Sequence, residues 1–215
     1  MVMQGAGSPD LIIPPGASPH SYAMRPSEAR AVAKADLVVW VGPSLAPWLE
    51  EPMSSLAQGA ERLTLQQVEG IRLLTNRSGV AFDADHADHD DHDHDAHEEA
   101  DAHAGHNHAP GALDPHIWLD PQNAVVWLDA IAASLSAQDP ENAALYADNA
   151  AQAQAQLVDL QADIQAELTP LRGQKFVVFH DAYHYFEARF DVEASAAISL
   201  SDGAAPSAAR LAEVR

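Results

Sequence analysis

The stretch Glu141–Leu168, ENAALYADNAAQAQAQLVDLQADIQAEL, is rich in Ala, Gln and Leu and contains neither Gly nor Pro. This composition favours an uninterrupted helix, and at about 1.5 Å per residue a helix of this length spans roughly 40 Å. Such a helix is long enough to cross from one lobe of a protein to another. We therefore expect a long, rigid interlobe helix within the segment 140–172.

The residues before this helix alternate between segments with strand character and segments with helix character. Apolar runs bounded by Gly, Pro or charged residues predict strands, and Ala-rich stretches behind a Ser or Pro predict helices. In chain order the predictions are a strand at 10–13, a helix at 28–35, a strand at 37–41, a helix at 47–57, a strand at 62–65 and a helix beginning at Pro121. This alternation is typical of a parallel sheet with helices on its faces. We expect an N-terminal α/β lobe that is made of 1–82 and ends with 109–139.

The residues after the long helix begin a second α/β unit. We expect a strand at 176–179, a helix at 180–190, a strand at 192–198 and a short helix at 206–215. Two strands are too few for a lobe of its own, so 173–215 is predicted to be an incomplete C-terminal lobe. The chain is expected to be truncated at its C-terminus, and at its N-terminus as well. The predicted fold class is therefore α/β, with two lobes of mainly parallel sheet joined by a long rigid connecting helix.

A segment of unusual composition, 83–108, interrupts the predicted N-terminal lobe. Its 26 residues include 10 Asp or Glu and 8 His but no Lys, Arg or large aliphatic residue, so it cannot pack a core. We interpret it as a disordered His/Asp-rich loop with weak, exchangeable metal sites. The alternative is a solvating linker whose His content is incidental. The eight loop histidines are His86, His89, His92, His94, His97, His103, His106 and His108.

The composition excludes several classes of partner. The chain has 215 residues, of which 47% are hydrophobic, and a formal net charge of -21, which repels nucleic acid and anionic lipid. No apolar run approaches the roughly 18 residues of a membrane span, and the first ten residues lack the features of a signal peptide. Because the sequence contains no cysteine, any metal site must use His, Asp or Glu. The segment 83–108 carries 10 of the 21 negative charges, which indicates a local role in gathering cations.

Three histidines outside this loop share a setting that suits metal binding. His20 follows the first predicted strand, His180 follows the strand at 176–179, and His116 precedes a predicted helix. The carboxyl ends of parallel strands present ligand-binding loops, and a set of imidazoles with few carboxylates suits Zn²⁺ better than Mn²⁺ or Fe. Taken singly, each residue also fits the role of a hydrogen-bonding surface histidine.

Three further residues are candidates for roles around such a site. His184 lies one helical turn after His180, but the Glu of a metalloprotease helix is missing between them, so we expect His184 to lie outside the ligand set. Asp181 and Asp114 are candidates to accept the remote ring N–H of a ligating histidine. Helix capping and turn formation are the alternatives for both carboxylates.

Four sequence blocks together resemble a known family. They are GASPHSY at 16–22 followed by RPS at 25–27, ADLVVWVG at 35–42, HIWLDP at 116–121, and FHDAY at 179–183 followed by YF at 185–186. In this order and spacing the blocks are similar to those of the ZnuA family, the periplasmic zinc-binding proteins of ABC transporters. That family carries a His/Asp-rich loop between the second and third blocks, which is where the segment 83–108 stands in this sequence.

The resemblance implies a high-affinity solute-binding protein for zinc transport, with no catalytic activity. It places the zinc ligands at His20, His116 and His180, in the cleft between two α/β lobes. It further implies a location in the periplasm and delivery of Zn²⁺ to the membrane permease of an ABC transporter, and we expect a monomer. Because protons compete for imidazole nitrogens, zinc affinity is expected to fall as the pH drops through about 6.5.

Two departures from the family pattern leave the fourth zinc ligand open. Pro19 stands where relatives often have an acidic residue, and the late stretch that supplies an acidic ligand in other relatives is not in this sequence. Water, a loop histidine or a residue beyond Arg215 is the expected fourth ligand. The alternatives to zinc delivery are a manganese-binding relative of the same family, a zinc storage or buffering protein, and a zinc-dependent hydrolase, which would need a general base beside a metal-bound water.

Overall fold

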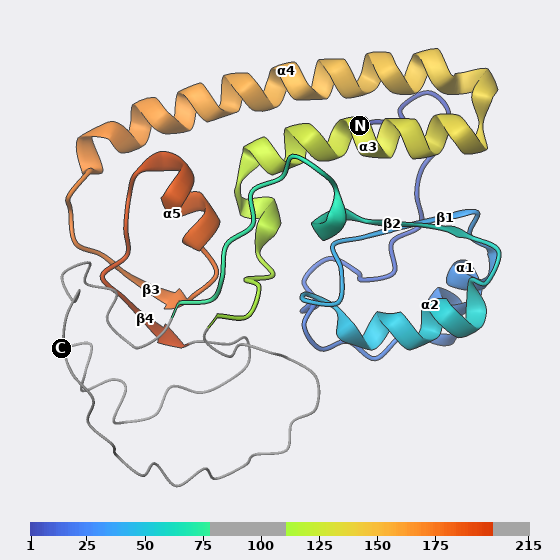
Figure 1. The fold of residues 1–215 in the computed structure, drawn as a ribbon, viewed down its shortest axis with the longest axis horizontal. Helices are drawn as coiled ribbons and strands as arrows, with labels where there is room; N and C mark the ends of the chain where they lie inside the picture. The colour runs from blue at the N-terminus through green and yellow to red at the C-terminus, as the bar shows by residue number, and fades with distance from the viewer. Residues whose placement is uncertain (78–110, 200–215) are drawn as a thin grey trace, which may run out of the picture.

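The computed structural model describes residues 1–77 and 111–199, so the predictions for the loop at 83–108 and the helix at 206–215 lie outside the described residues. In chain order its helices and strands are α1 (Pro26–Lys34), β1 (Leu37–Trp40), α2 (Glu50–Leu56), β2 (Glu61–Thr64), α3 (Pro121–Gln138), α4 (Ala143–Leu168), β3 (Val177–His180), α5 (His184–Phe190) and β4 (Ala196–Ser199). Short 3₁₀ turns lie before α2, α3 and α4. Figure 1 shows two groups of helices and strands with α4 running along both.

The N-terminal lobe is built on the parallel pair β1 and β2, with α1 and α2 on one side of it (Figure 1). Val32 of α1, Val38 of β1 and Met53 of α2 form its buried core. Apolar side chains at these positions are removed from water only when the helices cover the strands, which explains the layered arrangement. The four helices and strands predicted between residues 28 and 65 are confirmed.

The predicted strand at 10–13 is wrong, because these residues form no regular structure. Pro9 lies before the segment, and Pro14 and Pro15 follow it. Proline has no N–H to donate to a strand ladder, so prolines on both sides disfavour pairing. The segment contributes the partly buried Ile12 to the edge of the N-terminal core.

The predicted helix at Pro121 is confirmed as α3, and its first turn shows why it begins there. The Asp120 side chain accepts a hydrogen bond from the Gln122 N–H at 2.9 Å, and Pro121 occupies the first helical position. A side-chain oxygen at this place satisfies an N–H that has no partner inside the helix, and proline loses nothing there. Trp127 anchors α3 on the N-terminal lobe, since its indole N–H donates to the Leu65 carbonyl at 2.9 Å.

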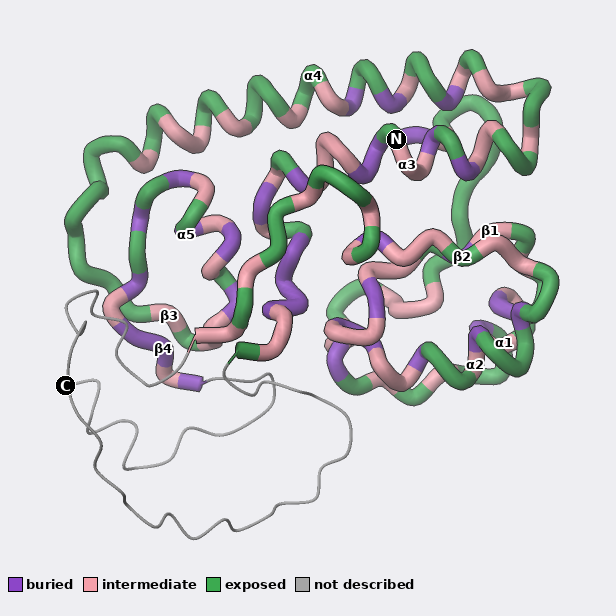
Figure 2. Tube along the Cα trace, viewed as in Figure 1, coloured by how far each residue is buried: buried purple, intermediate pink, exposed green. Residues whose placement is uncertain are grey.

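The long connecting helix is confirmed as α4, which has 26 residues. Its first half packs on α3, and the small side chains of Ala150 and Ala153 lie in a core cluster with Leu128 and Ala132. Figure 2 shows that the buried residues of α4 are confined to this half and that its second half is mostly exposed or intermediate. The second half of α4 therefore extends toward α5 with few packing contacts along its sides (Figure 1).

The C-terminal lobe contains the parallel pair β3 and β4, which are linked through α5. Val177 pairs with Ala196, and His180 pairs with Ser199. The strand predicted at 192–198 is found as β4, beginning four residues later. Within the described ranges each sheet has two strands, and the prediction of an α/β fold with parallel sheets and a long helix is confirmed.

The predicted helix at 180–190 begins later than expected. His180 is the last residue of β3, and α5 begins at His184. The Asp181 N–H donates to the Ser199 carbonyl at 3.1 Å, which prolongs the pairing with β4. Strand pairing therefore holds His180 and Asp181 out of the helix.

One buried tyrosine joins the two lobes. Tyr185 of α5 is fully buried in a cluster with Leu65, Ile117 and Trp127 from the N-terminal lobe and α3. Its hydroxyl accepts a hydrogen bond from the Leu74 N–H at 2.9 Å and lies 3.1 Å from the Asp114 carbonyl, to which it donates. The C-terminal lobe is thus fixed to the segments that flank the His/Asp-rich loop in sequence.

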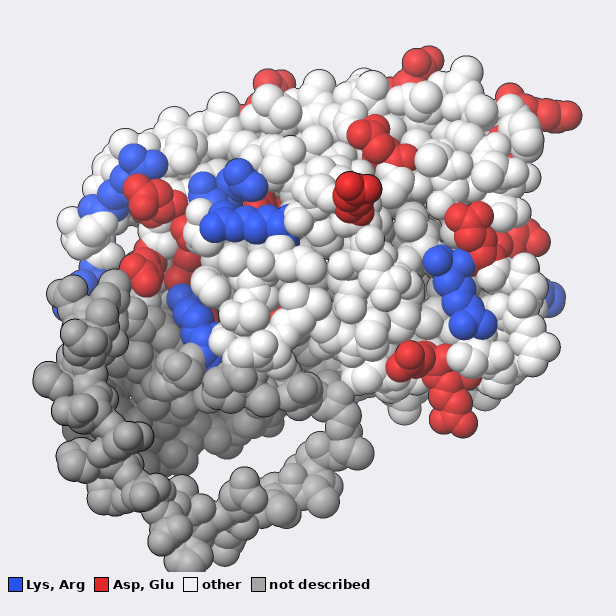
Figure 3. Space-filling view, in the orientation of Figure 1, with Lys and Arg blue, Asp and Glu red and all other residues white. Residues whose placement is uncertain are grey.

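Two features of the structure concern surface charge and helix hydrophobicity, from which we made predictions about binding to polyanions and membranes. On the face drawn in Figure 3, most Lys and Arg side chains stand beside Asp or Glu rather than forming a separate basic patch. No helix in the described part of the chain is long and apolar enough to cross a membrane.

We predict that Tyr185→Phe lowers the free energy of unfolding by about 1–3 kcal/mol at pH 8, because it leaves a buried N–H and a buried carbonyl with one partner fewer. Burial raises the pKa of Tyr185 from its usual 10.0 to about 12. The unfolded chain therefore releases this proton first, and the wild type loses the corresponding stability as the pH rises from 10 to 12. Chemical denaturation at several pH values measures both effects.

The matched control is Tyr183→Phe, which removes a hydroxyl from an exposed ring just before the same helix. We expect it to leave the unfolding free energy within about 0.5 kcal/mol of the wild type. An equal loss of stability in both variants would show that the Tyr185 hydroxyl does not join the lobes.

Candidate metal centre

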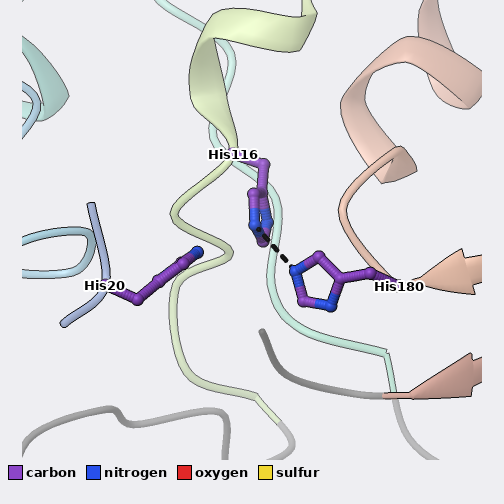
Figure 4. Close-up of side chains that lie close together, drawn as sticks. All are labelled: His20, His116 and His180. Carbon is purple, nitrogen blue, oxygen red and sulfur yellow. Dashed lines mark hydrogen bonds between the residues drawn. The ribbon is translucent and has the colours of Figure 1, made fainter. Parts of the chain in front are cut away.

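The three predicted site histidines outside the loop meet at one place. His20, His116 and His180 each offer one ring nitrogen, and these atoms all lie within 4.8 Å of one another. The ring centroids lie 5.2 Å apart for His20 and His116, 6.2 Å for His20 and His180, and 5.2 Å for His116 and His180. Figure 4 shows the rings converging from three separate segments of the chain.

The site lies at the junction of the two lobes and is largely enclosed. His20 and His116 are only 4% and 3% exposed, and His180 is partly buried. His116 and His180 face each other through their Nε2 atoms, which lie 3.3 Å apart. Enclosed imidazole nitrogens that face one another form a donor set suited to a metal ion such as Zn²⁺.

Contacts with α1 and with the turn before α2 hold the loop that carries His20. The Trp48 indole N–H donates to the Pro19 carbonyl at 2.9 Å, and the Ser18 hydroxyl accepts from the His20 N–H at 3.3 Å. The Tyr22 hydroxyl donates to the Glu28 carboxylate of α1 at 2.8 Å. Both ends of the short loop are thus fixed to the N-terminal lobe, and Pro19 contributes its carbonyl rather than an acidic side chain.

A buried carboxylate orients His116. Asp114 Oδ1 accepts from the His116 N–H at 2.9 Å and lies 2.7 Å from Nδ1 of the same ring. Asp114 is only 2% exposed, and its contact with Nδ1 leaves Nε2 as the ring nitrogen that faces His180. Asp114 thus lies where the prediction needs an acceptor for the remote ring nitrogen of His116, and its bond to the backbone N–H also fits the alternative of turn formation.

The edge of the C-terminal sheet positions His180. The residue ends β3 opposite Ser199, so its side chain is set by strand pairing. Its neighbour Asp181 forms a buried ion pair with Arg77, a role that the sequence did not indicate. His184 lies outside the three-histidine set, as expected, with Nδ1 at 3.8 Å from Asp114 Oδ2.

Arg77 and Trp118 are the two neighbours of the site that sequence reasoning missed. Arg77 forms ion pairs with Asp181 and Glu187. Burial alone would lower the pKa of Arg77, but the hydrogen bonds to Glu187 and Asp181 raise it above its usual value.

The partly exposed Trp118 ring lies 5.4 Å from the His116 ring in an edge-on arrangement. Trp118 lies inside the HIWLDP block, two residues after His116, and this position could have marked it as a neighbour of the site. The sequence around Arg77 gave no indication of its ion-pair partners.

Two α/β lobes bridged by a long helix, with a histidine cluster at their junction, define a metal-binding protein of the solute-binding class. The ZnuA family, described as "Zinc-uptake complex component A periplasmic", matches residues 1–215, and the chain belongs to this family. The high-affinity zinc uptake system protein ZnuA of Paracoccus denitrificans (strain Pd 1222) is 43% identical over 217 residues, covering 100% of this chain and 67% of that protein.

Two solved structures have the same fold. A crystal structure of ZnuA matches with a TM-score of 0.69 and 25% identity, over 95% of this chain and 66% of that chain. A zinc-bound crystal structure of a ZnuA deletion mutant matches with a TM-score of 0.68 and 25% identity, over 94% of this chain and 65% of that one. The chain thus spans about two thirds of the length of the relatives it matches.

We predict that Asp114→Asn weakens metal binding at the three-histidine centre by about 10–100-fold, because a carboxylate that fixes a ligand's tautomer also raises its basicity. Competition titration with a chelator of known affinity measures this change. Asp129→Asn, the same substitution at an exposed position of α3, is the matched control and should leave the affinity unchanged. Equal affinities in both variants would remove Asp114 from the account of the site.

Proposed function

We propose that this chain captures Zn²⁺ with His20, His116 and His180 and delivers it to the membrane permease of an ABC transporter. The observation that carries the proposal is the 3.3 Å separation of the His116 and His180 Nε2 atoms. At Zn–N distances of about 2.0–2.1 Å, two ligands of a tetrahedral zinc ion lie about 3.3–3.4 Å apart. The observed separation of the two nitrogens matches this spacing and so supports their role as ligands of one zinc ion.

The chemistry of the donor set favours zinc over manganese. The three residues that come together in the described part of the chain are all histidines. The carboxylate of Asp114 contacts Nδ1 of His116, the ring nitrogen that does not face His180. Neutral imidazoles suit Zn²⁺, whereas Mn²⁺ favours oxygen ligands. The zinc-bound structure of the ZnuA deletion mutant supports this choice of metal.

The same set leaves a fourth coordination position for a ligand other than these histidines. Three protein ligands and an open position make a zinc site that exchanges its last ligand, and exchange is what a carrier needs when it hands over its cargo. The proposed activity is capture and transfer, without catalysis. The name of the Paracoccus denitrificans relative, which refers to high-affinity zinc uptake, supports transport, and the family description supports a periplasmic location.

The His/Asp-rich loop has a separate role in this proposal. Its eight imidazoles and ten carboxylates in 26 residues raise the local concentration of cations at low affinity. The three-histidine centre then holds one ion tightly, because two of its ligands are buried and one is oriented by a carboxylate. In this proposal the three histidines bind one zinc ion tightly, and the segment 83–108 raises the local concentration of cations.

We predict that the triple variant His20→Ala, His116→Ala, His180→Ala loses its tight zinc site, because all three nitrogen ligands are removed. Isothermal titration calorimetry with zinc compares the stoichiometry and affinity of the variant with those of the wild type. His184→Ala, a histidine beside the site but outside the ligand set, is the control and should retain one tight ion per chain. If the triple variant still bound one zinc ion per chain with submicromolar affinity, the ligand assignment would be wrong.

We predict that deleting 83–108 removes the weaker zinc stoichiometry and leaves the tight ion in place, because His20, His116 and His180 all lie outside the deleted segment. The same titration, extended to millimolar zinc, resolves both classes of site. Loss of the tight site in the deletion variant would contradict this division of roles and would favour zinc storage by the loop.

A further inference from the structure

Arg77 is the centre of a buried polar network beside the metal centre. Its guanidinium contacts Asp181 through Nε at 3.1 Å and through Nη2, and it contacts Glu187 through Nη1 at 2.7 Å and Nη2 at 3.1 Å. The side chains of Asp181 and Glu187 are only 9% and 3% exposed. A guanidinium that binds two carboxylates with its rigid fork fixes both in distance and in angle.

One arm of this network ends next to a histidine of the site. Asp181 directly follows His180, and its N–H donates to the Ser199 carbonyl at 3.1 Å. The other arm ends on Glu187 of α5, which also accepts from the Ala194 N–H at 3.0 Å. Arg77 therefore holds the end of β3, the start of α5 and the approach to β4 together.

The backbone before Arg77 leads to the other half of the site. Thr75 and Leu113 form an antiparallel bridge, the Asn76 N–H donates to the Ala112 carbonyl at 2.8 Å, and the Asp114 N–H donates to the Leu74 carbonyl at 2.9 Å. This short ladder is defined by 74–76 and 112–114. It ends on the carboxylate that orients His116.

The two sets of contacts form a closed ring around the metal centre. The ring runs from His180 through Asp181 to Arg77, along the ladder to Asp114, and through His116 back to His180, where the two Nε2 atoms lie 3.3 Å apart. The ion pair joins the two lobes, and the ladder ties Arg77 to the segment that carries Asp114. A change in either is therefore expected to alter the separation of the two ligands.

We propose that Arg77 is a positioning residue that sets zinc affinity by holding His180 at the coordination distance from His116. This inference rests on the proposed zinc site. Arg77 does not touch the metal. It acts through Asp181 and the ladder, so that the site is assembled before the ion arrives, and the ion does not have to supply the free energy of ordering its ligands.

The test is Arg77→Lys, which keeps the positive charge but loses the fork that grips both carboxylates. We expect the zinc dissociation constant, measured by chelator competition, to rise about tenfold, at the low end of the effect of groups that support a metal ligand. The visible absorption of Co²⁺ bound in place of zinc should change as well, because it reports the coordination geometry. The rise in melting temperature on adding zinc should become smaller.

The matched control is Arg189→Lys. Like Arg77, Arg189 binds a carboxylate with its guanidinium fork: it comes from α5 and contacts the buried Asp120 at 2.6 and 2.7 Å. This pair lies outside the ring. We expect Arg189→Lys to lower the melting temperature of the zinc-free protein while the zinc dissociation constant stays within twofold of the wild type. Asp181→Asn, which removes a charge and keeps the side-chain shape, should weaken zinc binding as Arg77→Lys does.

The outcomes separate this inference from the proposed function. A wild type that binds zinc tightly, with Arg77→Lys and Asp181→Asn binding equally tightly, would overturn the role of Arg77 and leave the zinc site standing. Arg77→Lys and Arg189→Lys raising the dissociation constant equally would assign both arginines to general stability and would also overturn the role. A wild type without a tight zinc site would overturn the proposed function and this inference together.

Discussion

The insertion of Tyr185 into the core of the other lobe is the contact on which the rest of the structure depends. The side chain comes from α5, is fully buried, and makes hydrogen bonds with the backbone of Leu74 and Asp114. Its position fixes α5, and with it β3, against the segment that leads to His116. Without that docking, only α4 and polar contacts such as those of Arg77 and Arg189 would join the lobes.

The proposed metal centre depends on this docking, because its three candidate ligands come from both lobes. His20 and His116 are held by the N-terminal lobe, and His180 by the edge of β3. Each ligand has its own support, so the three imidazoles lie close together before any ion binds. The supports are a short polar ladder, a buried carboxylate and an arginine fork. Together they hold the His116 and His180 Nε2 atoms 3.3 Å apart, which matches tetrahedral zinc coordination.

Local sequence patterns predicted the parts of the molecule that local chemistry determines. Composition predicted α4, and the Asp–Pro pair at the start of α3 predicted its first turn. One error arose from neighbouring residues that the strand prediction overlooked, and the others arose where distant residues decide. Prolines on both sides removed the expected strand at 10–13, and pairing with Ser199 kept His180 out of α5. The contact of Arg77 with Asp181 spans 104 positions, and no local pattern encodes it. The domain boundaries and the zinc sites of the loop remain predictions.

We propose that zinc binds between His20, His116 and His180 at a site fixed by the packing of the two lobes. The most direct measurement is a crystal structure of the zinc-loaded protein with anomalous data collected on both sides of the zinc absorption edge. The account predicts the strongest anomalous peak at about 2.0–2.1 Å from one nitrogen of each histidine, with Asp114 still bound to His116. A strongest peak elsewhere in the chain, or one of the three rings turned away from the ion, would contradict it.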